Sequence, residues 1–260
     1  MFLGELTWCE VEAHKHKVLV MPIGSLEQHG HHTPLLTDSL IGGEVVRRVE
    51  AELGEEAVFL PMLWVGASNH HRAFPGTISL SNDLYVKVLI DMLESAIGAG
   101  FRKIFLLNSH GGNVVPGEMA MYDVQLRHRF DKPDLYMALA CWWTISAKEV
   151  AAIESLEQKH VTHACELETS MILTIRPELV KTELARGANV PFESAFYTPD
   201  FSKPSRVSVA RAFEQVSETG SFGHPELATA EKGEELYQVA TREIVKFVRE
   251  FAKWEVFPPN

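Results

Sequence analysis

The sequence predicts an α/β fold, a single domain over residues 1–260 built on a mostly parallel sheet with helices on both faces. Short apolar runs that are typical of buried strands alternate with amphipathic helical patterns, as they do where crossover helices cover a parallel sheet. A chain of 260 residues, 46% of them apolar, can fill a sizeable core. The sequence has no internal repeat and no low-complexity linker, which favours one domain over two.

Strand and helix patterns take turns in the first half of the chain. The apolar runs 18–24 and 57–62 each predict a strand. Between them, residues 37–39 are N-cap candidates for a helix whose apolar residues recur at helical spacing as far as Leu53. A further helix is expected between the capping residues 81–83 and the glycines Gly98 and Gly100.

The second half continues this alternation and adds one irregular stretch. Residues 187–225 are rich in proline, serine, phenylalanine and glycine and show neither period, so we expect a lid, a binding segment or an oligomer contact there. The regular elements expected around it are strands at 103–108 and 135–140, helices at 114–129 and 147–158, a helix that begins near His163, and a C-terminal helix with apolar residues over 236–251.

Charge and composition disfavour several kinds of partner. The formal net charge of −11 argues against nucleic acid or an anionic membrane as the main partner. No run approaches the ~18 apolar residues of a membrane span, and the first residues lack the features of a signal peptide. Three distant cysteines exclude a disulfide scaffold and a cysteine-rich zinc module, so we expect a cytoplasmic location.

A first polar cluster follows the strand at 18–24. Glu27 and His29 are two residues apart, so in an extended segment their side chains point to one side. Asp38 follows at the start of the next helix. Ligands of open α/β sheets bind at the carboxyl ends of strands, and two carboxylates with an imidazole suit a divalent transition metal. The alternative is a solvated histidine-rich turn.

A second cluster, Asn-Ser-His-Gly-Gly-Asn at 108–113, follows the strand at 103–108. Paired glycines let the backbone turn sharply and approach a ligand, and amides at the start of the following helix could bind an anion. The segment is not a phosphate-binding loop, since no Lys-Ser/Thr pair follows the glycines. The alternative is a helix-capping turn in which His110 is incidental.

A third cluster carries His163, Glu166 and Glu168. If this segment is helical, Glu168 falls within the buried stripe, where a carboxylate needs a metal, a partner charge or a proton. Glu166 shares a face with His163 and is expected to face solvent or substrate. The alternative for Glu168 is an ion pair with a basic residue in the core.

These segments together resemble the creatininase (creatinine amidohydrolase) family, which includes creatininase, archaeal formamide hydrolases and the peptidase that matures mycofactocin. The resemblance covers most of the chain. Five blocks in the family's order carry it, at 22–38, 74–80, 108–113, 163–170 and 223–233.

The resemblance implies an α/β fold with two divalent metal ions, zinc, manganese or iron. Glu27 and His110 would bind one ion and His29 the other, with Asp38 bridging them. Creatininase has a glutamate where this chain has Gly112. In the formamide hydrolase and peptidase branches, which share the Gly-Gly form, the carboxylate that matches Glu168 can complete the site, and Glu166 is the fallback ligand.

The function implied is hydrolysis of a non-peptide C–N bond in a small cyclic or linear amide, creatinine-like or formamide, by a metal-bridged hydroxide. His163 would pass a proton to the leaving nitrogen, and Glu166 could orient its imidazole. The two tryptophans are adjacent, so at most one should line the pocket. The substrate contacts expected are His70, Thr77, Gly111, Gly112, Trp142 and Trp143.

Two other functions remain open at this point. The same metals could open a cyclic polyol ketone by C–C hydrolysis, or the chain could be a non-catalytic metal-binding scaffold. The family further implies a homohexamer, so the expected partners are a small-molecule substrate and other copies of this chain, with no nucleic acid and no membrane.

Overall fold

The computed structural model describes residues 1–158, 160–190 and 192–255, and within them four parallel strands form the central sheet. The strand order is β2-β1-β3-β4. Val18 is paired with both Ala57 and Lys103, which sets the register of the three strands. The strands are β1 (Val18–Ile23), β2 (Ala57–Phe59), β3 (Lys103–Asn108) and β4 (Tyr136–Cys141). The predicted fold class is therefore confirmed.

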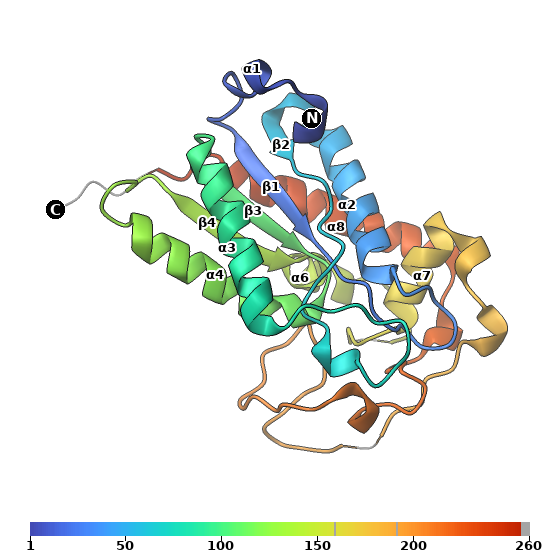
Figure 1. The fold of residues 1–260 in the computed structure, drawn as a ribbon. Helices are drawn as coiled ribbons and strands as arrows, with labels where there is room; N and C mark the ends of the chain where they lie inside the picture. Colours follow the sequence, from blue (N-terminus) through green and yellow to red (C-terminus); the bar gives the residue numbers. More distant parts are fainter. Residues whose placement is uncertain (159, 191, 256–260) are drawn as a thin grey trace.

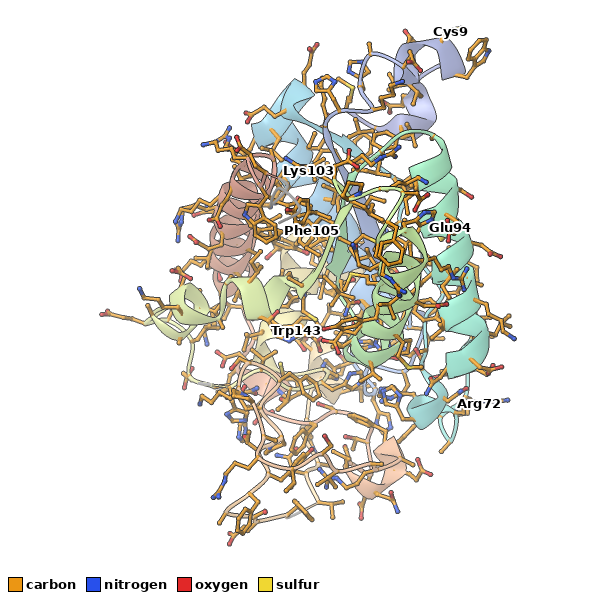
Figure 2. All side chains as sticks on the ribbon, turned by 90° about the vertical axis from the view of Figure 1, so that its left-hand side faces the viewer. Cys9, Arg72, Glu94, Lys103, Phe105 and Trp143 are labelled. Atoms are coloured by element: carbon orange, nitrogen blue, oxygen red, sulfur yellow. The ribbon has the colours of Figure 1, made fainter. Side chains whose placement is uncertain are left out.

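Helices cover both faces of this sheet, as Figure 1 shows. On one face lie α3 (Asn82–Gly98) and α4 (Val114–His128). On the other lie α2 (Thr37–Leu53), α7 (Glu166–Ile175) and α8 (Ala230–Phe251), with α8 on the opposite side of the molecule from α3 and α4 in Figure 2. Three short helices, α1 (Trp8–Val11), α5 (Trp142–Ile145) and α6 (Ala147–Ala151), complete the set in the described part of the chain.

Alternation along the strands divides the interior into two cores. Val18 and Val20 of β1 pack with α2 and α8, whereas Leu19 and Met21 pack with α3. Successive side chains of a strand point to opposite faces, so a strand that is covered on both sides is apolar throughout. Phe105 of β3 lies in the first core, with its ring centroid 4.9 Å from that of Phe247 of α8.

The order of the strands places a crevice between β1 and β3. The chain leaves β1 for α2 on one face of the sheet and leaves β3 for α4 on the other. Because these connections diverge, the loops that follow the two neighbouring strands leave space between them, which is where open α/β sheets bind ligands. No helix of the described residues has both the length and the apolar character that a membrane span needs.

The start of α2 differs from the prediction that one of residues 37–39 is its N-cap. The N-cap is Leu36, and the polar residues lie in the first turn. Asp38 and Ser39 face the loop after β1 instead: Ser25 Oγ donates to Asp38 Oδ2 at 2.7 Å, and Ser39 Oγ donates to the Ser25 carbonyl at 2.8 Å. The side chains of Asp38 and Ser39 therefore connect α2 to the loop after β1 and do not cap the helix.

Other boundaries also move. The prediction of a helix over 147–158 is wrong beyond Ala151, where α6 ends. The helix expected near His163 begins at Glu166, because Ala164 adopts a left-handed φ of 48° that interrupts the helical path. β2 ends at Phe59, two residues before Pro61, which has no N–H for a ladder. Residues 187–225, of which 191 is outside the described residues, contain a 3₁₀ turn at Phe213–Gln215 and end where another, Pro225–Leu227, begins.

Helices α7 and α8 approach closely at Gly233. A Cβ at that position would lie 2.1 Å from the Ser170 carbonyl oxygen and 2.2 Å from Thr174 Oγ1. Contacts this short with backbone require one helix to move. Gly233 therefore sets the separation of the two helices, and with it the position of the glutamates on α7.

We expect Gly233→Ala to lower the free energy of unfolding by about 1–2 kcal/mol, since overpacking outweighs the better helix propensity of alanine. Gly43→Ala on α2 is the matched control, because a Cβ at Gly43 meets nothing within 4 Å. That change should raise the free energy of unfolding by about 0.5–1 kcal/mol. Urea unfolding of both variants measures this, and equal effects of the same sign would contradict the close approach.

Candidate functional site

A cavity of about 410 Å³ opens at the carboxyl ends of β1 and β3. The three polar clusters of the sequence converge on it: Glu27 from the loop after β1, His110 from the loop after β3, and Glu168 from α7. Asp38, in the first turn of α2, also lines it. All four side chains are buried. The crevice predicted by the strand order is thus occupied by titratable groups.

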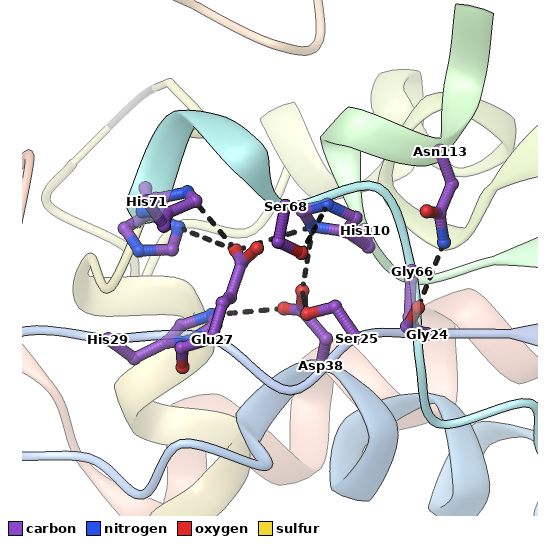
Figure 3. A network of polar contacts seen from close by, with 12 residues as sticks. Gly24, Ser25, Glu27, His29, Asp38, Gly66, Ser68, His71, His110 and Asn113 are labelled. Carbon is purple, nitrogen blue, oxygen red and sulfur yellow. Dashed lines mark hydrogen bonds and ion pairs between the residues drawn. The ribbon is translucent and has the colours of Figure 1, made fainter. Parts of the chain in front are cut away.

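Asp38 lies at the centre of this cluster (Figure 3). Its Oδ1 is 3.0 Å from His29 Nε2, and its Oδ2 is 3.0 Å from His110 Nδ1. Ser25 also holds the carboxylate by donating its hydroxyl to Oδ2. One carboxylate therefore joins two imidazoles that come from the loops after two different strands.

Glu27 forms a second centre next to Asp38. Its Oε1 lies 3.3 Å from His110 Nδ1, 3.3 Å from His71 Nε2 and 3.7 Å from His163 Nδ1. Its Oε2 is buried and has no hydrogen-bond partner among the described residues. An ionised oxygen in that situation is costly unless a cation or a donor is present.

Backbone carbonyls fix which nitrogen of each imidazole faces the carboxylates. His29 Nδ1 is 3.1 Å from the Glu27 carbonyl oxygen, and His110 Nε2 is 3.2 Å from that of Ala67. A carbonyl only accepts, so these nitrogens carry the N–H, and the lone pairs of His29 Nε2 and His110 Nδ1 face the cluster in the neutral rings. This arrangement is common around metal-binding histidines.

Glu168 completes the cluster from α7. The left-handed Ala164 aims its backbone N–H at Glu168 Oε2, with a distance of 2.5 Å. Two sets of three side chains each have ligand atoms within 4.8 Å of one another and share Asp38: Glu27, Asp38 and His110, and His29, Asp38 and Glu168. Two further sets, both with Glu27, add His70 and His71 or His29 and His163.

The pKa values show how strongly these groups interact. Burial alone would raise the pKa of Glu27, but the charges of His110 and His71 hold it well below its usual value. Burial opposes protonation of His29, yet the neighbouring Asp38 raises its pKa to about 9. Burial, with the charges of Asp38 and Glu27, raises the pKa of Glu168 to about 7. Without a cation, protons on groups such as His29 and Glu168 therefore balance the negative charge of the carboxylates.

The residues present fit divalent cations. Three buried carboxylates within one cluster repel one another, Glu27 Oε2 has no donor, and the lone pairs of two imidazoles point inward. Oxygen and imidazole ligands without a thiolate suit zinc, manganese and iron. Glu27, Asp38 and His110 could hold one cation, and His29, Asp38 and Glu168 could hold another.

Glu166 does not belong to this cluster, and the expectation that it faces solvent or substrate is wrong. It is fully buried, with its Oε1 2.6 Å from Lys232 Nζ of α8. Its Oε2 accepts the backbone N–H of Gln158 at 2.5 Å. The core ion pair considered for Glu168 is thus made by Glu166, and the chain after α6 folds around this carboxylate.

His163 lies in the cavity, but its neighbours differ from those expected. Its Nε2 is 2.8 Å from the Gln28 carbonyl oxygen, so this nitrogen donates and Nδ1 faces Glu27. The ring packs against those of His29 and Phe213, with centroids 4.2 and 4.5 Å away. Burial holds the pKa of His163 well below its usual value. The expected partner Glu166 makes none of these contacts.

Two residues of the site were missed by the sequence analysis. His71 contacts Glu27, and its Nδ1 accepts from Gln28 Nε2 at 2.7 Å. Gln28 lies between His71 and His163 and also donates to the Gly220 carbonyl at 3.1 Å. In the sequence, Gln28 stands between the predicted ligands Glu27 and His29, and this position could have indicated that it belongs to the site.

The predicted substrate contacts separate into two groups. His70, Gly111, Gly112 and Trp143 line the cavity, and their contact with a substrate stays a prediction. The other two do not line it. Thr77 accepts the backbone N–H of Gln28 at 3.2 Å and so connects two loops, and Trp142 is buried in the core. Only one of the adjacent tryptophans therefore reaches the pocket, as expected.

The loop at 108–113 is held by its asparagines and is tightly packed at Gly112. Asn108 Oδ1 accepts the N–H of His110 at 3.0 Å, and Asn113 Nδ2 donates to the Gly24 carbonyl at 2.9 Å. A Cβ at Gly112 would lie 2.2 Å from the Ala67 carbonyl oxygen and 2.4 Å from His110 Nε2. The loop thus has no room for any side chain at position 112 unless its backbone moves.

We expect Asp38→Ala to lose both cations, because Asp38 belongs to both three-residue sets. Glu168→Ala should lose one. The measurement is metal content by mass spectrometry after loading with Zn²⁺ or Mn²⁺ and gel filtration. Glu166→Gln, two residues away on α7, is the matched control and should retain the wild-type content. Two cations on Asp38→Ala would exclude the shared role of this carboxylate.

Lys232→Met should lower the free energy of unfolding by about 3 kcal/mol, because it leaves the buried Glu166 carboxylate without its cation. Lys203→Met is the control: the Lys203 side chain is 65% exposed in its ion pair with Asp200, so a loss of at most ~1 kcal/mol is expected. Guanidinium unfolding of the metal-free proteins compares the two. Equal losses would mean that the Lys232 pair is not a core contact.

Comparisons with known proteins agree with this geometry. The family model for creatininase, described as creatinine amidohydrolase, matches residues 4–248. Creatinine amidohydrolase of Pseudomonas putida is 30% identical over 277 residues, covering 100% of this chain and 98% of the relative. A mycofactocin precursor peptide peptidase of Mycolicibacterium smegmatis is 34% identical over 225 residues, covering 85% of this chain and 79% of the relative.

Solved structures match along the whole chain. A mutant creatininase complexed with creatine superimposes with a TM-score of 0.80 at 26% identity, covering 97% of this chain and 99% of that one. A manganese creatininase gives 0.77 at 26% identity, covering 99% of each. The prediction of a metal-dependent hydrolase of C–N bonds is confirmed at the level of the family. The chain belongs to the creatininase (creatinine amidohydrolase) family.

Proposed function

We propose that this chain is a dinuclear metal-dependent amidohydrolase that hydrolyses a non-peptide C–N bond in a small cyclic or linear amide, creatinine-like or formamide. The observation that carries the proposal is the position of Asp38, whose two oxygens each lie 3.0 Å from a different histidine. A carboxylate with ligand nitrogens on both sides is suited to bridge two cations.

In this proposal Glu27, Asp38 and His110 hold one cation, and His29, Asp38 and Glu168 hold the other. Glu168 is favoured over Glu166 as the fifth ligand because the Glu166 carboxylate is already paired with the Lys232 ammonium group. When bound, the cations, which we take to be zinc, manganese or iron, lower the pKa of a water molecule and polarise the substrate carbonyl.

The remaining side chains handle the substrate and a proton. His163, neutral at rest, is proposed to take a proton from the attacking water at its free Nδ1 and to pass it to the leaving nitrogen, while the Gln28 carbonyl keeps Nε2 as a donor and so fixes the ring. The backbone amides near Gly111 and Gly112 line the cavity and are proposed to stabilise the developing oxyanion. His70 and Trp143 are proposed to contact the substrate from the cavity wall.

A second candidate reaction is hydrolysis of a C–C bond in a cyclic polyol ketone. It is favoured by one relative, a 3-dehydro-scyllo-inosose hydrolase of Thermotoga maritima, which is 28% identical over 171 residues. The same ligands and the same water activation would serve that reaction. A non-catalytic metal-binding scaffold would keep the ligands but have no use for His163 in the cavity.

Assembly into a homo-oligomer, expected to be a hexamer, is part of this proposal, and so is a cytoplasmic location. The exposed face of α4 supports oligomerisation, because large apolar side chains recur on it at helical spacing. They are Val115, Met119, Tyr122 and Leu126. The segment 187–225 is proposed to act as a lid or an oligomer contact around the cavity.

We expect chelation to reduce turnover at least 100-fold and readdition of Zn²⁺, Mn²⁺ or Fe²⁺ to restore it. The substrate panel contains creatinine, aryl and alkyl formamides, a short peptide and cyclic 1,3-diketones, with Asp38→Ala as the inactive control. Turnover of amides by the metal-loaded enzyme supports the proposal, turnover of diketones alone favours the second candidate, and metal binding without any turnover favours the scaffold.

A further inference from the structure

The cavity has two parts of different chemistry. One is the cluster of carboxylates and histidines at the strand ends. The other is formed largely by the irregular segment, which lies below the carboxyl ends of the sheet in Figure 1. Its wall is mainly apolar, with contributions from Phe201, Val209, Phe213, Val216 and Phe222.

Arg211 lines this apolar part. Of the described residues around the cavity, it is the one lysine or arginine. Its guanidinium carbon lies 4.6 Å from the ring centroid of Phe192 and 5.4 Å from that of Tyr197, and its Nη2 is 3.4 Å from Tyr197 Oη. None of these described partners is a carboxylate. Stacking on the two rings holds the guanidinium without using up its charge.

The contrast with Arg48 shows what is missing at Arg211. The Arg48 guanidinium donates from Nη1 and Nη2 to both carboxylate oxygens of Glu234, at 2.8 and 2.7 Å. This two-pronged contact is the arrangement that a planar guanidinium forms with carboxylates and phosphates. Arg211, half-buried in the cavity wall, has the same donors and no such acceptor from the described chain.

We propose that the substrate carries an anionic group, a carboxylate or a phosphate, on an apolar body, and that Arg211 binds this group while the scissile amide lies at the carboxylate–histidine cluster. This inference rests on the proposed function in one respect: it assumes that the molecule bound in the cavity is the substrate. A local positive charge is needed for such a ligand, because the chain as a whole carries a formal net charge of −11. Arg211 is thus a specificity-determining residue.

Binding to the metal-loaded protein tests the proposal without turnover. The probes are 3-phenylpropanoate, phenyl phosphate and the neutral 3-phenylpropan-1-ol, with dissociation constants from calorimetry or ligand-observed NMR. Arg211→Gln should weaken binding of the preferred anion about 10- to 100-fold and change that of the alcohol less than about 2-fold. The tighter of the two anions identifies the group as carboxylate or phosphate.

Arg206→Gln is the matched control. Arg206 belongs to the same segment and stacks at 4.6 Å over the ring of Phe196, but it does not line the cavity, so its loss should leave all three constants unchanged. Arg211→Lys keeps the charge without the planar fork and should recover part of the affinity for the anion. It also serves as the test if Arg211→Gln does not fold. Equal affinity for anions and alcohol, or anion binding insensitive to both Arg211 variants, would overturn the proposal.

Turnover separates this inference from the proposed function. If Arg211-dependent anion binding is found but no amide is hydrolysed, the inference stands and the amidohydrolase proposal fails. If N-formylphenylalanine and N-formylphenethylamine are hydrolysed with the same kcat/KM, and Arg211→Gln changes neither value, the function stands and the inference is overturned.

Discussion

The buried carboxylate of Asp38, shared between His29 and His110, is the contact on which the rest of the site depends. A fully buried carboxylate is tolerated only with partner charges and hydrogen bonds, so elements that carry those partners must meet at one point. They come from the loop after β1, the loop after β3 and the first turn of α2. Ser25 and Ser39 join the first and the last of these elements independently of the histidines.

The strand order brings these elements together. β1 and β3 are neighbours in the sheet, although 79 residues lie between Ile23 and Lys103 in the sequence. The helices that follow these two strands lie on opposite faces of the sheet. The two loops therefore rise on either side of the same crevice. The irregular segment supplies the outer wall, which explains why a stretch without regular structure still buries Phe213 and Val216.

Two glutamates of helix α7 have different roles because they lie on different sides of the helix. Glu166 and Glu168 are two residues apart, which is about 200° around a helix, so they cannot face the same neighbour. Glu168 faces the carboxylate–histidine cluster, whereas Glu166 pairs with Lys232 and fixes α7 against α8. The ion pair and the close approach at Gly233 both hold α7 against α8 on the side of the helix that faces away from the site. They fix the position of the helix, and with it the position of Glu168.

The sequence by itself determined the alternation of strands and helices and indicated that three polar clusters meet at one edge of the sheet. Period and local order are enough for this, because buried parallel strands are continuously apolar and ligand-bearing loops follow their carboxyl ends. Glu27 and His29 lie in the loop after β1, His110 lies in the loop after β3, and Asp38 lies in the first turn of α2, so the fold class places all four at the same edge of the sheet.

Only the tertiary structure decided which glutamate of α7 pairs with a lysine 66 residues away, where the helix after Ala147 ends, and which tryptophan reaches the cavity. It also placed Gln28 between two histidines and Arg211 in the wall. Each of these outcomes is a choice between partners that are equivalent by residue type and local period. The choice depends on the distances between elements far apart in the chain, which no local pattern contains.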